Sequence, residues 1–331
     1  MRLVFYGTPD LAVPILTQLA ENGTPPSLVV TRRDRPKGRG LSSAPSPVRA
    51  AAEARGIPVS TPARAGAPEE IARLAALKPD LIVLAAYGQI LPAEVLSIPR
   101  LGALNVHFSL LPRHRGASPI QAAILAGDSE TGVTTMWMTD KLDEGPVFTS
   151  LRTPIGAEEN AGELRARLAE LGARCLLESL ARIERGEVVR ESQDSARATY
   201  APKFVREDAR LSLHDAPAAF SRKVRAFTPE PGAYLDLEQG ALQVVAASPG
   251  EGSAAGSTEP GHDTASTLAV APGTVLALDR ARGLLVSLGS GSVWLRRVRP
   301  SGRKEMGGQD YANGARLKPG SGLQTKPEPG Q

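Results

Sequence analysis

Residues 103–145, ALNVHFSLLPRHRGASPIQAAILAGDSETGVTTMWMTDKLDEG, decide the fold of this chain. They contain a short strand signal that follows a glycine turn, then a helix signal and a second apolar run at 133–138. Side chains alternate between the two faces of a strand, so Asn105 and His107 are predicted to share one face. Open α/β sheets bind ligands beyond the carboxyl ends of their strands, which is where this pair is expected.

Asp143 follows the second apolar run, in the sequence Leu-Asp-Glu-Gly. Its carboxylate is predicted to return to His107 and orient the imidazole ring. An asparagine amide and a protonated imidazole both donate to an oxygen that becomes negative during acyl transfer. From the residues alone two interpretations stay open: a catalytic trio, or a satisfied polar pair at a sheet edge with an aspartate that serves a turn.

Length and composition favour a two-domain enzyme-sized protein rather than a disulfide scaffold or a membrane protein. The chain has 331 residues, 41% hydrophobic and 22% charged, with a formal net charge of +4. Cys175 is the only cysteine, which excludes a disulfide framework and a cysteine-rich zinc site. The apolar start of the chain stops at Gly7, too early for a signal peptide. We therefore expect a cytoplasmic protein.

Strands alternating with helices predict a doubly wound, mostly parallel α/β domain over residues 1–188. The turn at Gly7 lacks the three spaced glycines of a dinucleotide fingerprint, so no nicotinamide cofactor is expected. Strands are predicted at 2–6, 28–31, 57–59, 80–86, 101–107, 133–138 and 146–154, and helices at 11–21, 46–55, 69–77 and 162–184.

A polar linker is expected at 189–205, and a smaller all-β domain at 206–318. A basic helix signal at 216–227 precedes short strands separated by glycine turns, a pattern typical of a small β-barrel. A Gly/Ser/Ala/Thr-rich insertion at 248–267 and a tail at 319–331 are predicted to be disordered. The predicted strands are at 233–237, 241–246, 273–277, 283–287 and 292–298.

Residues 105–134, followed by LDEGPV at 142–147, resemble the core of the formyltransferases that use 10-formyl-tetrahydrofolate. Other segments are similar to the methionyl-tRNA formyltransferase branch: VFYGTP at 4–9, a basic loop at 31–48, APKF at 201–204 and RAFTPEP at 225–231. The last segment departs from the branch because Glu230 replaces the usual aromatic residue. The resemblance spans nearly the whole chain and implies an OB-like fold for the second domain.

The resemblance implies that Asn105, His107 and Asp143 are catalytic and that 10-formyl-tetrahydrofolate is the formyl donor, with no metal. It implies that two loops bind the folate, in which backbone groups meet the pterin edge. Gln121 and Arg115 are further candidates for lining this pocket, and His114 is the only other histidine of interest. The residues of the two loops are Tyr87, Gly88, Gln89, Ile90 and Leu91, and Ser109, Leu110, Leu111 and Pro112.

The resemblance also implies contact between the basic loop and the acceptor end of a tRNA, with Arg39 foremost, accompanied by Arg35 and Lys37. A second basic stretch at 294–318 contributes Arg303 and Lys304 as candidates for phosphate contact. On composition alone, both stretches are equally typical of solvated surface.

The predicted activity is formylation of methionyl initiator tRNA by a monomer. Three alternatives stay open: formylation of another amine, such as a sugar nucleotide or glycinamide ribonucleotide; hydrolysis of the formyl-folate; and RNA binding without catalysis.

Overall fold

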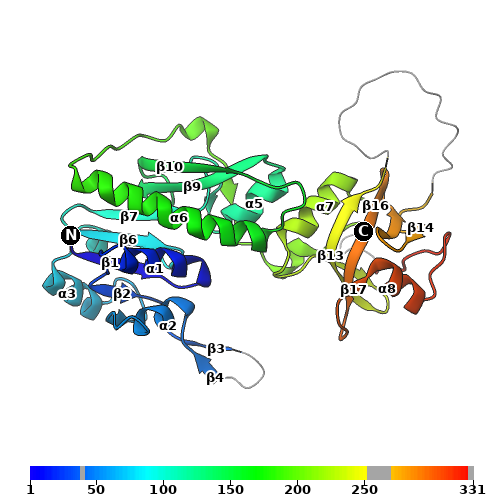
Figure 1. The fold of residues 1–331 in the computed structure, drawn as a ribbon, viewed down its shortest axis with the longest axis horizontal. Helices are drawn as coiled ribbons and strands as arrows, with labels where there is room; N and C mark the ends of the chain where they lie inside the picture. The colour runs from blue at the N-terminus through cyan, green and yellow to red at the C-terminus, as the bar shows by residue number, and fades with distance from the viewer. Residues whose placement is uncertain (38–41, 252–269, 327–331) are drawn as a thin grey trace. The chain divides into compact units, whose positions relative to one another are not determined.

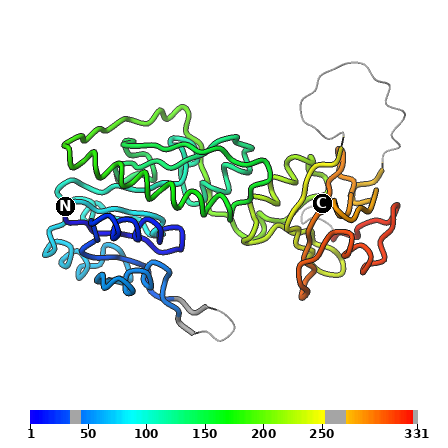
Figure 2. Tube along the Cα trace, in the orientation of Figure 1, coloured from blue at the N-terminus to red at the C-terminus, as the bar shows by residue number. Residues whose placement is uncertain are grey.

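The computed structural model describes residues 1–37, 42–251 and 270–326. The chain forms two compact units, followed in the trace of Figure 2. One contains Met1–Ile120, Ser129–Ile155 and Leu164–Lys203, and the other Gln121–Asp128, Gly156–Glu163 and the chain from Phe204 onward. The two short segments fall inside the range expected for the first domain, and Leu125 of the first packs against the core of the second unit. No helix in the described ranges is long and apolar enough to span a bilayer.

A mostly parallel, seven-stranded sheet forms the first unit, in the order β10-β9-β7-β6-β1-β2-β5 (Figure 1). The pairs among β5, β2, β1, β6 and β7 are parallel, whereas β9 and β10 run antiparallel. The predicted doubly wound α/β class is therefore confirmed. The strands are β1 Leu3–Gly7, β2 Leu28–Val30, β5 Val59–Ser60, β6 Leu81–Ala85, β7 Ala103–His107, β9 Glu130–Trp137 and β10 Val147–Pro154.

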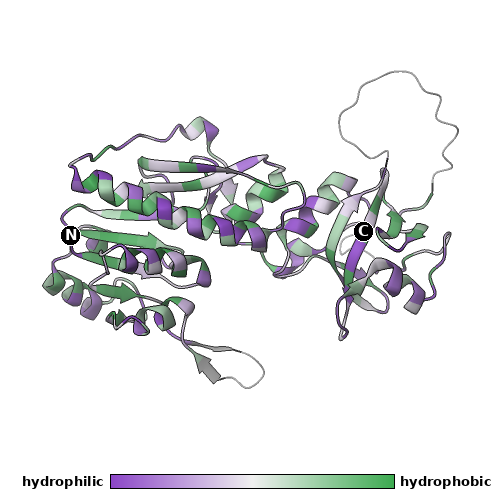
Figure 3. Ribbon diagram, in the orientation of Figure 1, coloured by the Kyte–Doolittle hydropathy of each residue, from purple (hydrophilic) through white to green (hydrophobic). Residues whose placement is uncertain are grey.

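Helices cover both faces of this sheet. Leu74 of α3 and Val95 of α4 pack on the face that carries Val4 and Ile82. On the other face, Gly172 of α6 lies against β7 and α1, where an added Cβ would meet side-chain atoms at 3.3–3.4 Å. Figure 3 shows the matching pattern, with apolar strands and a two-sided α6. The elements are η1 Asp10–Ala12, α1 Val13–Glu21, α2 Pro47–Glu53, α3 Pro68–Leu77, α4 Ala93–Leu96, α5 Pro119–Ala126 and α6 Ala161–Glu184.

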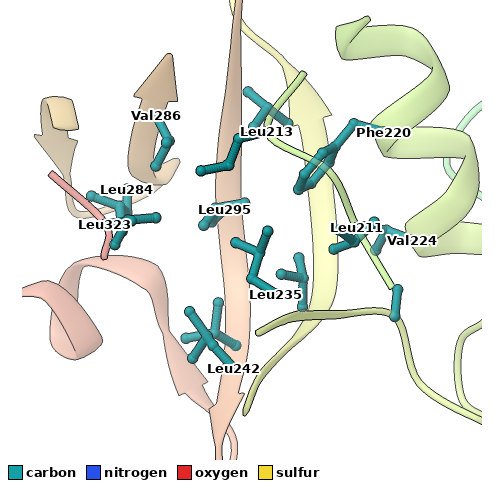
Figure 4. Close-up of a cluster of buried hydrophobic side chains, with 14 of the residues drawn as sticks. Leu211, Leu213, Phe220, Val224, Leu235, Leu242, Leu284, Val286, Leu295 and Leu323 are labelled. Carbon is teal, nitrogen blue, oxygen red and sulfur yellow. The ribbon is translucent and has the colours of Figure 1, made fainter. Parts of the chain in front are cut away.

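The second unit contains an antiparallel sheet in the order β12-β13-β16-β15-β14, with β17 paired to β16. Its inward side chains form one apolar core, part of which is drawn in Figure 4. This agrees with the predicted small all-β domain. The elements are η3 Arg206–Ala209, α7 Pro217–Ala226, β12 Tyr234–Leu237, β13 Gly240–Pro249, β14 Val275–Asp279, β15 Gly283–Ser287, β16 Ser292–Pro300, β17 Met306–Gly307 and α8 Gly308–Gly314.

The prediction of a disordered tail at 319–331 is wrong for residues 319–326, the part that the structure describes. Thr325 bridges to Leu237 at the end of β12, and Gly322 bridges to Thr274 beside β14. Leu323 is 7% exposed and lies in the core beside Leu284 (Figure 4). The segment has the composition of a loop. It is ordered because it pairs with backbone groups at two sheet edges that would otherwise be unpaired. Most of the predicted insertion, residues 252–267, lies outside the described residues.

Candidate active site

Asn105 and His107 lie at the carboxyl end of β7, two residues apart and therefore on one face of the sheet. β7 runs between β6 and β9, with Leu84 opposite Asn105 and Thr134 opposite His107. The side chains of Asn105 and His107 are buried, with 7% and 5% exposure. Two polar groups held on a central strand in this way have little freedom to move, as a preorganised site requires.

Asp143 comes to this pair from the loop after β9. Its Oδ2 lies 3.6 Å from His107 Nδ1, and Asn105 Nδ2 donates to its Oδ1 at 3.4 Å. The backbone amide of Gly116 donates to Oδ2 at 2.8 Å. Asp143 has φ of +52°, a left-handed conformation that an aspartate tolerates better than most residues. The structure thus brings the three predicted catalytic side chains together.

The two ring nitrogens of His107 face acceptors in the protein, whereas Asn105 Oδ1 has no partner in the described chain. His107 Nε2 lies 2.9 Å from the carbonyl oxygen of His114. With a carboxylate oxygen 3.6 Å from Nδ1, both ring nitrogens face acceptors. The Oδ1 atom of Asn105 is buried and has no hydrogen-bond partner in the described chain. A buried amide oxygen of this kind calls for a donor from outside the protein.

The turn after β7 is rigidly held by its own polar groups. Ser109 Oγ donates to the carbonyl of Arg113 at 2.6 Å, and the amide of Leu111 donates to Thr134 Oγ1 at 3.2 Å. Ser109 is fully buried, whereas Leu110, Leu111 and Pro112 are partly exposed. The apolar side chains therefore form the accessible part of this predicted folate loop, and Ser109 only shapes it.

In the second predicted folate loop, most side chains are turned into the protein. The ring of Tyr87 turns into the core, 1% exposed and 5.0 Å from the ring of Tyr6, and burial raises the pKa of its hydroxyl to about 12. The Gln89 side chain accepts from the amide of Ala65 at 3.0 Å. Leu91 is buried, and Ile90 is 81% exposed. The exposed Ile90 side chain, Gly88 and the peptide groups around Gly88 remain accessible to a ligand.

Two polar residues lie beside Asp143: Arg115, which is buried, and Gln193, which is partly buried and which nothing in the sequence singled out. Arg115 was expected to line the pocket, but it is 2% exposed and donates from Nε and Nη2 to Gln193 Oε1, at 3.1 and 2.9 Å. Gln193 lies in the stretch expected to be a plain linker. That stretch instead forms η2 Ser195–Arg197 and β11 Tyr200–Ala201, and β11 pairs in parallel with β8 Arg115–Gly116.

The residues predicted to contact tRNA are only partly visible. Arg39 lies outside the described residues, and so do the side chains of Arg35 and Lys37, whose backbones form β3 Arg35–Lys37. This strand pairs with β4 Ser42–Ala44, so the basic loop contains a hairpin. Arg303 and Lys304 are exposed in the turn after β16, and within the described chain neither forms an ion pair.

Comparison with known proteins places this geometry in a family. The formyl transferase model matches residues 1–180, and the model of the formyl transferase C-terminal domain matches residues 203–316. The chain is 42% identical over 320 residues to the methionyl-tRNA formyltransferase of Geobacter metallireducens, covering 97% of each. It is 45% identical over 323 residues to that of Halorhodospira halophila, covering 98% of this chain and 99% of that protein.

Solved structures with lower sequence identity show the same fold. HypX from Aquifex aeolicus, solved in complex with tetrahydrofolic acid, superimposes with a TM-score of 0.63 at 21% identity, covering 99% of this chain and 49% of that longer chain. An N-formyltransferase from Helicobacter canadensis gives a TM-score of 0.62 at 16% identity, covering 89% of this chain and 98% of that chain. The chain belongs to the formyl transferase family, and within it to the methionyl-tRNA formyltransferases.

Proposed function

We propose that this chain transfers the formyl group of 10-formyl-tetrahydrofolate to the α-amino group of methionyl initiator tRNA. The observation that carries the proposal is the buried trio of Asn105, His107 and Asp143 at the carboxyl end of β7. The near full-length similarity to methionyl-tRNA formyltransferases, including the second unit, supports the identity of the acceptor. The proposal includes action in the cytoplasm as a monomer, without a metal.

The chemistry follows from the donors that the trio offers. The neutral amine attacks the formyl carbon, a new C–N bond forms, and the carbonyl oxygen becomes an oxyanion. The second N–H of the Asn105 amide donates to that oxygen, and the positive charge of the protonated His107 ring stabilises it. When the bond from the formyl carbon to the folate nitrogen breaks, the electron pair returns to that nitrogen, which takes up the proton lost by the amine.

Two further groups support this reaction. Asn105 Oδ1, buried without a partner in the described chain, is placed to accept from an N–H of the attacking amine. Asp143 holds a negative charge 3.6 Å from the His107 ring, which stabilises the protonated ring as the oxyanion develops. A water molecule, directly or together with the Asp143 carboxylate, carries the proton from the amine on its way to the folate nitrogen.

The folate position in this proposal rests on the two loops. The peptide groups around Gly88 meet the donor–acceptor edge of the pterin, and the partly exposed Leu110–Pro112 segment packs on its flat face. The left-handed φ of Gly88, +83°, suits the close approach of a flat ring to the backbone.

The experiment is formylation of charged initiator tRNA by Asn105→Ala, His107→Ala and Asp143→Asn variants. Asn105→Ala removes an oxyanion donor and is expected to lower kcat/KM by about 10²–10³. His107→Ala and Asp143→Asn remove the charged ring and its carboxylate partner, and losses of similar size are expected. Asn22→Ala and His214→Ala, both at exposed positions, are the matched controls and should retain full activity. Circular dichroism and thermal unfolding check that the fold is kept.

The substrates distinguish the proposed activity from its alternatives. Formyl-methionyl-tRNA should form only with charged tRNA present. Formate release without tRNA would identify a hydrolase, and formylation of an aminosugar nucleotide or glycinamide ribonucleotide in its place would identify a sister enzyme. Activity within twofold of the parent in all three site variants would contradict the site.

A further inference from the structure

Gln193 makes four hydrogen bonds through one partly buried amide group. Its Oε1 accepts from Nε and Nη2 of Arg115, at 3.1 and 2.9 Å. Its Nε2 donates to the backbone carbonyl of Asp143 at 2.8 Å and to that of Gly145 at 2.7 Å. The side-chain amide thus uses both of its donors and both of its acceptor positions. A fully satisfied amide between two segments acts as a clamp on the loop that carries Asp143.

These bonds add to those that Asn105 and Gly116 make with the Asp143 carboxylate. Leu142, the residue before Asp143, is 62% exposed, and Asp143 itself has a left-handed backbone conformation. Non-glycine residues in that conformation cost free energy and persist only where the surroundings enforce it. At Gly145 an added Cβ would lie 1.7 Å from the carbonyl oxygen of Trp137, so the loop also passes very close to β9.

Arg115 makes the second half of the clamp. The guanidinium is 2% exposed and is held by the amide of Gln193, with Nη1 lying 3.5 Å from a Glu144 carboxylate oxygen. The next residue, Gly116, donates its amide to Asp143 Oδ2. Removal of Gln193 therefore leaves a buried charge without its main acceptor, directly beside the strand that binds the Asp143 carboxylate.

The backbone around Gln193 binds the same region. The amide of Arg115 donates to the carbonyl of Thr199 at 2.8 Å, and that of Ala117 donates to the carbonyl of Ala201 at 2.9 Å. Thr199 Oγ1 accepts from the amide of His114 at 2.8 Å. The two ends of segment 193–201 are therefore bonded to the residues around the site, and the exposed η2 lies between them.

We propose that Gln193 is a positioning residue for the reaction: it fixes the backbone of Asp143 so that the carboxylate faces His107. The inference rests on the proposed function, because it acts through Asp143. Gln193 touches neither substrate in this proposal, so its loss lowers kcat and leaves the KM for both substrates nearly unchanged. A displacement of about 1 Å at a reacting group is enough to lower a rate about a hundredfold.

The test compares Gln193→Ala, Gln193→Glu and the control Asp194→Ala, using the full-length enzyme with 10-formyl-tetrahydrofolate and charged initiator tRNA. Gln193→Ala should lower kcat about ten- to hundredfold, with KM values within twofold of the parent. Gln193→Glu keeps the shape and the bond to Arg115 but sets a carboxylate against two carbonyl oxygens, so it should be equally impaired. Asp194 caps the exposed η2 in the same stretch, and its replacement should leave kcat unchanged.

A double-mutant cycle with Asp143→Asn separates positioning from general destabilisation. Because Gln193 acts through Asp143, adding Gln193→Ala to Asp143→Asn should lower kcat less than twofold further. Full activity in Gln193→Ala, or multiplicative losses in the double variant, would overturn the inference. A fully active Asp143→Asn would also overturn the inference, whereas a parent enzyme that forms no formyl-methionyl-tRNA would overturn the proposed function, so the two failures are distinguishable.

Discussion

Cys175 is buried in the middle of α6 and is the one thiol of the chain. Its Sγ donates weakly to the carbonyl oxygens of Val133 and Thr149, at 3.8 and 3.7 Å. Burial raises the pKa of the Cys175 thiol from 9.0 to about 12, because the thiolate loses its hydration there. The folded state therefore keeps a proton that the unfolded chain releases at lower pH.

This difference makes stability fall with pH in a defined window. Below pH 9 both states hold the proton and Cys175 has no effect; between pH 9 and 12 only the unfolded state releases it, which favours unfolding. The free energy of unfolding of the parent, relative to Cys175→Ala, should therefore drop by about 1 kcal/mol from pH 8 to pH 10. Urea titrations at the two pH values measure this, and parallel losses in both proteins would contradict it.

At the scale of residues, periodicity predicted one part of the site and missed another. Asn105 and His107 share a face because strand side chains alternate, which the sequence shows directly. Asp143 was proposed from its place after the second apolar run, but the residues alone left a turn role equally open, and the resemblance favoured catalysis. Gln193 was missed because it binds Arg115 across 78 residues of sequence, and a polar residue in a loop carries no mark of such a partner.

Segment 319–326 pairs with both edges of the sheet in the second unit, which the sequence did not predict. Leu323 donates its amide to the carbonyl of Gly273, and Lys326 donates to the carbonyl of Asp236, so the segment bonds to the chain next to β14 and to β12. Two edges that would otherwise expose backbone groups are thereby covered. The segment adds both hydrogen bonds and one leucine to the core.

Truncation measures this contribution. A chain ending at residue 326 loses only positions outside the described residues and should unfold like the parent. A chain ending at residue 319 loses Leu323, and the free energy of unfolding of the second unit should fall by at least about 2 kcal/mol, as for other buried leucines. Trp294 fluorescence in a Trp137→Phe background reports this unit. Equal midpoints for the two truncated chains would contradict the structural role.

Most elements of both units were predictable, because apolar periodicity and capping residues act locally. Ser46 was expected to start a helix, and its side chain accepts from the amide of Arg49 at the N-terminus of α2. The two-residue strands β8 and β11 and the helix α8 were not expected, since they are too short to show a period. They form because neighbouring segments supply backbone partners, which is a property of the fold and not of the local sequence.

At the scale of the whole molecule, the net charge of +4 is less informative about tRNA contact than the difference between ion-paired and unpaired basic side chains. Arg297 and Arg299 both contact Glu305, at 3.1 Å for Arg299, so their charges are compensated in place. Arg303 and Lys304 have no such carboxylate in the described chain and are exposed. A count of basic residues over 294–318 did not distinguish these two groups, because pairing depends on the turn that returns Glu305 to β16.

If the exposed pair contacts tRNA phosphates, its removal changes how binding depends on salt. Each neutralised phosphate releases condensed counterions, so the slope of log K against log salt concentration should become shallower by about 1.5–2 in Arg303→Ala/Lys304→Ala. Arg297→Ala is the matched control: because Arg297 is already paired to Glu305, its slope should stay within about 0.5 of the parent.

Filter binding of charged initiator tRNA between 50 and 200 mM salt, about the range in which such effects are large, measures both slopes. The formylation rate at saturating tRNA should be unchanged in the double variant, because phosphate contacts position the tRNA without touching the reacting atoms. A control slope as shallow as that of the double variant would mean that the binding surface is set by total charge, and that ion pairing within the second unit does not select its contacts.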